Sequence, residues 1–138
     1  MKKTSIFILI LGFTLLFSQN QTLAINKTLE LEKTDSLHQD FDKPAVYPGG
    51  INAFKNNFSR TFNAGKINAR GKIKSEAQFA VSKEGIITDI VITGGNKSMN
   101  KEMERTLKTM SQTKWKPAEL KGQPVKCKLR FPLTMSFE

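Results

Sequence analysis

The stretch VKCKLRFPLTMSF at residues 125–137 carries the strongest local pattern in this chain, because apolar and polar side chains alternate through it without a break. Such a period of two predicts a β-strand that buries one face. The odd positions, from Val125 to Phe137, would face the core. One even position is Pro132, which has no N–H to donate to a neighbouring strand. Within sheets, proline lies on an edge strand with its nitrogen turned outward, so we expect an edge here.

Two further strands are expected upstream of this one. Residues 72–81 alternate, residues 86–93 are rich in isoleucine and threonine, and the SKEG between them contains a glycine, so the pair predicts a β-hairpin. A left-handed Gly85 would place Val81 opposite Ile87. A bulge near Gly85 would then bring Ile90 and Ile92 to the core face.

Two amphipathic helices are expected from apolar residues that recur at spacings of three and four. The first follows the turn at residues 48–50 and ends by Gly65, and the second has Asn96 or Ser98 as its N-cap and residues 115–117 as its stop. We expect Trp115 to close the second helix onto the sheet, with a buried ring and a hydrogen-bonded N–H. The apolar residues that recur are Ile51, Phe54, Phe58 and Phe62 in the first helix, and Met99, Met103, Leu107 and Met110 in the second. The methionine stripe of the second helix is expected to be core.

The order helix, strand, strand, helix, strand predicts an α+β fold, a three-stranded antiparallel sheet with two helices packed on one face. A right-handed crossover places the third strand beside the first, which gives the strand order 2-1-3 and makes the third strand an edge. Backbone groups of residues 126, 128 and 130 would then point outward with that of residue 132, while those of residues 127, 129 and 131 bond to the first strand.

Two interpretations of this edge stay open on the residues alone. Lysines, arginine and proline are residue types that protect an edge from aggregation. An open edge is also a site where an extended peptide adds a strand through main-chain hydrogen bonds. In the second interpretation the candidate partner-binding residues are Lys126, Lys128, Arg130, Pro132 and Thr134.

The N-terminus resembles an export signal. Two lysines precede the apolar run IFILILGFTLLF, which is shorter than the about 20 residues needed to span a bilayer. We expect a signal peptide at residues 1–19, with cleavage as late as Ala24, a polar leader at residues 20–43 and one domain at residues 44–138. An uncleaved segment that anchors the protein in the inner membrane is the alternative.

Composition narrows the function classes. Without Lys2 and Lys3 the chain keeps 20 basic and 12 acidic side chains, a formal charge of +8. An exported protein seldom meets nucleic acid, so this charge favours anionic envelope surfaces or acidic peptides. His38 has no metal-ligating neighbours, Cys127 is expected to be a buried apolar side chain, and no catalytic motif is present. We therefore expect no enzymatic activity, no metal and no cofactor.

Four segments resemble the C-terminal domain of TonB proteins, in order and spacing, over residues 44–138: VYPGGINAF, FAVSKEGIITDIVITGG, WKPAELKGQPV and RFPLTMSF. The resemblance rests on Tyr47, Pro48, Gly85, Trp115, Pro117 and Gly122, to which we assign structural roles. It implies a periplasmic module of energy-coupled transmembrane transport. Such a module captures the extended N-terminal segment of a TonB-dependent outer-membrane transporter by pairing it with the last strand.

The family's other partners find less support. TonB proteins contact the motor proteins ExbB and ExbD through a transmembrane anchor that bears a histidine, and a proline-rich spacer follows. Residues 4–19 contain no histidine and residues 20–43 no proline, so contact with the motor proteins is doubtful. A basic envelope- or cell-wall-binding or structural module without transport coupling is the alternative function, and a homodimer through the sheet edges also stays open.

Export can be tested directly. Because the apolar run is short and has lysines on one side only, we expect cleavage between Ser18 and Ala24 and release into the periplasm. Cell fractionation with mass spectrometry of the N-terminus measures this. Intact protein that begins at Met1 in the inner-membrane fraction would contradict it and favour the anchored form.

Overall fold

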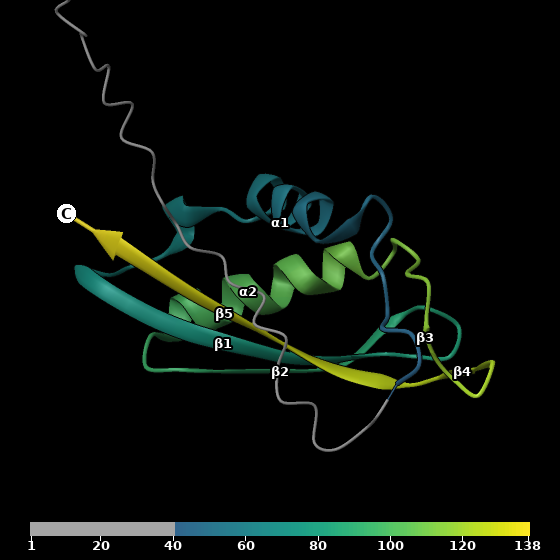
Figure 1. The fold of residues 1–138 in the computed structure, drawn as a ribbon. Helices are drawn as coiled ribbons and strands as arrows, with labels where there is room; N and C mark the ends of the chain where they lie inside the picture. The colour runs from purple at the N-terminus through teal and green to yellow at the C-terminus, as the bar shows by residue number, and fades with distance from the viewer. Residues whose placement is uncertain (1–40) are drawn as a thin grey trace, which may run out of the picture.

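The computed structural model describes residues 41–138. The predicted signal peptide, its cleavage sites, His38 and nearly all of the polar leader lie outside the described residues. The elements, in chain order, are α1 (Gly50–Thr61), the short 3-10 helix η1 (Ala64–Lys66), β1 (Gly71–Val81), β2 (Ile87–Gly94), α2 (Lys97–Met110), β3 (Ala118–Leu120), β4 (Gln123–Val125) and β5 (Cys127–Phe137) (Figure 1).

The main sheet has the order β2-β1-β5, and both pairings are antiparallel. In the ladder of β1 and β5, Gly71 lies opposite Phe137 and Val81 opposite Cys127, with no shift of register between them. Both helices lie on the same side of the sheet (Figure 1). The predicted α+β class, the strand order and the edge position of the last strand are confirmed.

The hairpin of β1 and β2 follows the prediction at its turn but not at its bulge. Gly85 has a φ of 82°, and Val81 lies opposite Ile87. The register shifts further along, between the pairs of Gln78 and Ala80, where two residues of β2 oppose one of β1. Asp89, at this bulge, has a φ of 53°, which an aspartate tolerates better than most residues. The extra residue turns the half-buried Ile90 and Ile92 towards the core.

The second helix begins as expected and ends earlier. The Asn96 side chain accepts a hydrogen bond from the Met99 N–H at 2.8 Å, so Asn96 is the N-cap. The helix ends at Met110, ahead of the predicted stop, because a tight turn follows in which the Thr113 N–H bonds to the Met110 carbonyl at 3.0 Å. The chain then reaches Trp115 in non-helical conformation.

A second, two-stranded sheet of β3 and β4 was not expected. Lys121 and Gly122, both with positive φ, form the two-residue loop between its strands, as in a type I′ turn. This hairpin breaks the predicted strand of residues 125–137, so β5 begins at Cys127 and Lys126 stands outside it. The segment before α1 lies against the same region through bridges of Lys43 with Glu119 and of Val46 with Lys116.

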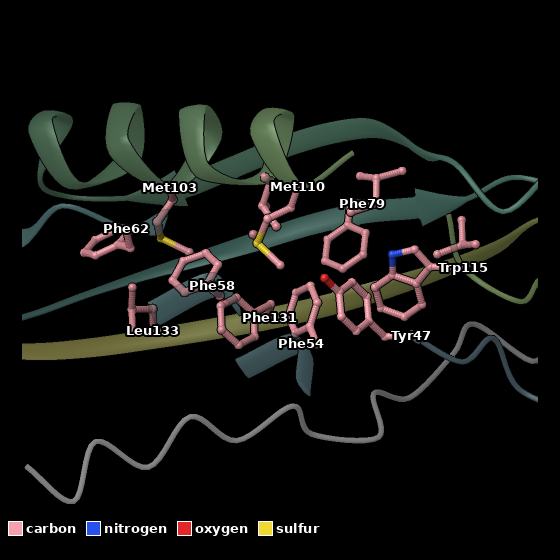
Figure 2. Close-up of a cluster of buried hydrophobic side chains, with 14 of the residues drawn as sticks. Tyr47, Phe54, Phe58, Phe62, Phe79, Met103, Met110, Trp115, Phe131 and Leu133 are labelled. Atoms are coloured by element: carbon pink, nitrogen blue, oxygen red, sulfur yellow. The ribbon is translucent and has the colours of Figure 1, made fainter. Parts of the chain in front are cut away.

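Aromatic rings fill the space between the helices and the sheet. Figure 2 shows them in a row from Phe62 to Trp115, below the methionines of α2. Phe58 of α1 meets Phe131 of β5 with ring centroids 4.7 Å apart. The methionine stripe of α2 and Cys127 are buried, as predicted for core residues.

The expectation for Trp115 is half right. Its side chain is 3% exposed, and its ring lies 5.2 Å from that of Tyr47 and 5.4 Å from that of Phe54. Its indole N–H, however, has no hydrogen-bond partner among the described residues, so the predicted hydrogen bond is wrong. The physical reason is the ring's surroundings, which are largely aromatic faces and edges.

A buried carboxylate joins α2 to the end of α1. Glu102, 3% exposed, accepts hydrogen bonds from the Arg105 guanidinium, at 2.9 Å from Nε, and from the Asn63 N–H at 2.8 Å. Arg105 also donates to the Thr61 carbonyl at 2.6 Å. The Arg105 hydrogen bond is the main reason that the pKa of Glu102 lies below its usual value, although burial acts in the opposite direction.

Trp115→Ala should lower the free energy of unfolding by about 3–5 kcal/mol, because it vacates a site enclosed by three aromatic side chains. Urea denaturation followed by circular dichroism measures the loss. A variant that keeps wild-type stability but loses a ligand would instead make Trp115 a binding residue.

Glu102 should make stability depend on pH. Its pKa is lower in the folded than in the unfolded protein, so its contribution is full above the unfolded value, about 4.5, and is lost as the pH falls towards the folded value. Glu102→Gln keeps an acceptor for the Asn63 N–H but cannot ionise. The difference in urea midpoint between wild type and this variant should therefore shrink between pH 7 and pH 3. An unchanged difference would contradict this role of Glu102.

Candidate strand-addition edge

The direction of each backbone group in β5 follows from one hydrogen bond in the neighbouring hairpin. The Ser82 N–H bonds to the Ile86 carbonyl at 2.9 Å, so the backbone of Ser82 points towards β2. Directions alternate along an extended strand, so odd positions of β1 point towards β5. Their partners in β5 are also odd, which leaves the even positions pointing away from the sheet. Pro132 falls in this outward set, as its missing N–H requires.

This outward edge is unpaired within residues 41–138. The main sheet ends at β5, and the isolated bridges of the described segment involve residues 43, 46, 116 and 119 only. The outward N–H and C=O groups of residues 128, 130, 134 and 136, and the carbonyl of Pro132, are therefore available to a further strand.

The candidate binding residues lie on the face of the sheet opposite the helices, which we call the open face. Lys128 and Arg130 are exposed, whereas Pro132 and Thr134 are half-buried. These four residues lie opposite the even residues of β1, from Ala80 to Lys74. Lys126 differs from them, because it precedes the strand and takes no place in the ladder.

Two ion pairs neutralise part of the positive charge on this face. The Lys126 ammonium bonds to the Asp89 carboxylate, and chiefly for this reason the pKa of Asp89 lies below its usual value. Arg130 Nε lies 3.6 Å from Glu76 Oε1. Lys128 makes no ion pair with a side chain of residues 41–138. Sequence reasoning missed Asp89 and Glu76, since only the bulge and the strand register bring them to these lysine and arginine side chains.

The other side of β5 offers apolar surface beside the edge. Phe131 and Leu133 are fully buried, but Leu129, Met135 and Phe137 are only partly buried against the core. A strand added to β5 would place every second side chain next to these three residues.

The six residues assigned structural roles lie within or next to residues 44–50, the β1–β2 turn and residues 115–122. Tyr47 packs against Trp115, and its hydroxyl accepts a hydrogen bond from Asn57 Nδ2 at 2.6 Å. Pro48 belongs to the turn before α1, Pro117 leads into β3, and Gly122 forms the β3–β4 loop.

Gly85 is the most constrained of the six. Its carbonyl accepts a hydrogen bond from the Trp115 N–H at 2.7 Å, and a Cβ at this position would lie 2.0 Å from the Trp115 carbonyl oxygen. Its φ of 82° adds a second reason why only glycine fits. These residues shape the end of the sheet from which β5 starts.

Other kinds of site are not evident in the described part of the chain. Residues 41–138 hold no group of three or more histidine, cysteine, aspartate or glutamate side chains that could bind a metal ion. None of their helices is long and apolar enough to cross a bilayer. Burial raises the pKa of the Cys127 thiol, which keeps it protonated and unreactive.

Comparisons of the chain with family models, with curated proteins and with solved structures give no match. The likeness to TonB C-terminal domains therefore rests on the order and spacing of the four sequence segments quoted above.

Proposed function

We propose that this protein is a periplasmic, TonB-like peptide-binding module. In this proposal the open edge of β5 pairs with the extended N-terminal segment of a TonB-dependent outer-membrane transporter. The module thereby takes part in energy-coupled transmembrane transport and catalyses no reaction.

The observation that carries the proposal is the outward edge of β5, unpaired within residues 41–138 from Cys127 to Phe137. Its outward groups follow one another at every second residue, which matches the repeat of an added strand. Strand addition takes its affinity from such main-chain bonds, and side chains on alternate positions add specificity.

Several features that usually blunt an edge are missing from β5. Proteins protect edges with short strands, with bulges, or with a covering segment. β5 pairs with β1 along its whole length without a register shift, and none of residues 41–138 pairs with its outer side. Its charged residues and proline still discourage aggregation, so the same edge serves both purposes.

The alternative is a basic module that binds the envelope or cell wall. The excess of basic residues favours it, and such binding would weaken strongly with salt and show no preference among peptides. Strand addition at this edge requires neither contact with ExbB and ExbD nor pairing of two copies, and it is compatible with an exported or an anchored protein.

Proline substitution separates binding from folding. Lys128→Pro removes an outward N–H and no ladder bond, and the preceding residue is already extended, as proline requires. It should fold with a modest loss and bind a transporter N-terminal peptide about tenfold more weakly, since one main-chain bond is lost and the ring obstructs the edge. Titration of the labelled protein with the peptide, followed by amide NMR, measures this.

Two matched variants control this experiment. Lys128→Ala removes the charge but keeps the N–H, and it should retain most of the affinity if main-chain pairing dominates. Leu129→Pro removes a ladder bond and an apolar side chain together, so it should lose several kcal/mol of stability. Equal affinity of Lys128→Pro and wild type for a peptide that binds would show that β5 is only a protected edge.

A further inference from the structure

Basic side chains gather on the open face along β1, along β5 and at the residue before β5. They are Lys72, Lys74, Lys126, Lys128 and Arg130, and the acidic residues facing them are Glu76 and Asp89. At its paired positions on this face, β2 contributes only Thr88, Val91 and Thr93. The two edges of the sheet therefore differ, since positive charge lies along β5 and the paired open-face residues of β2 are uncharged.

Part of this charge is not neutralised by other side chains of residues 41–138. Lys128 has no ion-pair partner among residues 41–138, and it is exposed. Arg130 meets Glu76 only at 3.6 Å, with half of its side chain exposed, so this pair is weak. Asp89 bonds to Lys126, and the nearby charge of Lys128 also helps to lower the pKa of Asp89. One carboxylate therefore stands beside two ammonium groups.

The geometry of strand addition places particular side chains of a ligand next to Lys128 and Arg130. Residues that lie directly opposite in neighbouring antiparallel strands have Cβ atoms about 4.5–5.5 Å apart. Lys128 and Arg130 are two residues apart and share one face. Two side chains at positions i and i+2 of the ligand would therefore stand beside them on the open face.

The intervening side chains of the ligand would lie on the opposite face of the sheet. There they would meet Leu129 and, further along, Met135 and Phe137, which the core leaves partly uncovered. Apolar side chains fit these positions, because they would extend the core by one strand.

We infer that the edge of β5 selects an extended segment in which apolar residues alternate with acidic ones, with carboxylates at two positions i and i+2 facing Lys128 and Arg130. This inference rests on the proposed strand addition and specifies the ligand that the edge takes. The binding surface is the β5 edge, since the open face of β2 offers no comparable charge.

Three synthetic heptapeptides of identical length test the inference. Each has valine at positions 2, 4 and 6 and threonine at positions 1 and 7, and positions 3 and 5 carry glutamate, glutamine or lysine. Binding to the purified protein is measured by fluorescence anisotropy of one dye common to all three. We expect the glutamate peptide to bind about fivefold more tightly than the glutamine peptide, and the lysine peptide to bind more weakly than both.

Charge reversal at the edge should reverse the preference. Lys128→Glu places a carboxylate at the open edge, so it should favour the lysine peptide over the glutamate peptide. Lys101→Glu, at an exposed position of α2, makes the same change of net charge away from the edge and should leave the order of the three peptides unchanged. Thermal unfolding verifies that both variants are folded.

The outcomes separate this inference from the proposed function. Equal affinities for the three peptides, with weaker binding by Lys128→Pro, would overturn the charge preference and leave strand addition standing. An equal effect of Lys101→Glu and Lys128→Glu would assign the preference to net charge and overturn it as well. Failure of all three peptides to bind, while a transporter N-terminal peptide binds, would overturn the charge preference alone. Binding that Lys128→Pro does not weaken would overturn both.

Discussion

The unbroken pairing of β1 with β5 is the constraint on which the rest of this structure depends. Each residue from Gly71 to Val81 lies opposite one residue from Phe137 to Cys127, and no bulge intervenes. Because side chains alternate with a period of two, this single register sends every apolar position of β5 to the helices and every polar one to the open face. A slip by one residue would bury lysines and expose phenylalanines.

Two sets of contacts support this register, one on the core face of the sheet and one at the end where β5 begins. On the core side, Phe54 and Phe58 of α1 meet Phe131 of β5, so the first helix packs over the edge strand. At the end where β5 begins, the bond from the Trp115 N–H to the Gly85 carbonyl ties the chain after α2 to the turn between β1 and β2. Trp115 and Tyr47 close the row of rings there, which fixes the place from which the edge strand starts (Figure 2).

The open edge follows from the strand order, in which β5 is the last strand of the main sheet. The helices cover one face of the sheet, β1 satisfies one side of β5, and the outer side of β5 stays unpaired within residues 41–138. Under the proposed strand addition, Lys128 and Arg130 have two compatible effects. They discourage pairing with a second identical edge, because like charges would lie opposite each other, and they favour a ligand of opposite charge. In the proposed function, protection of the edge and selective binding would both follow from one charge pattern.

The sequence by itself determined the two helices, the three strands of the main sheet and their faces, but not the hairpin of β3 and β4. The alternation of residues 125–137 predicted the last strand and its core face, Pro132 predicted an edge, Gly85 the turn and Asn96 or Ser98 the helix cap, because each of these depends on local geometry or on the side chain's own chemistry. The order of the elements and the handedness of crossovers then sufficed for the strand order and for the outward set of β5.

Only the tertiary structure decided the details that depend on contacts between distant residues. The bulge sits at Asp89, to which Lys126, the residue before β5, bonds. The indole N–H of Trp115 lacks a partner among the described residues, since aromatic side chains meet there from α1, β1 and the segment before α1. Glu102 became a buried link only when α1 and α2 packed together. In each case the deciding contacts come from residues far away in sequence, and no local sequence pattern records such contacts.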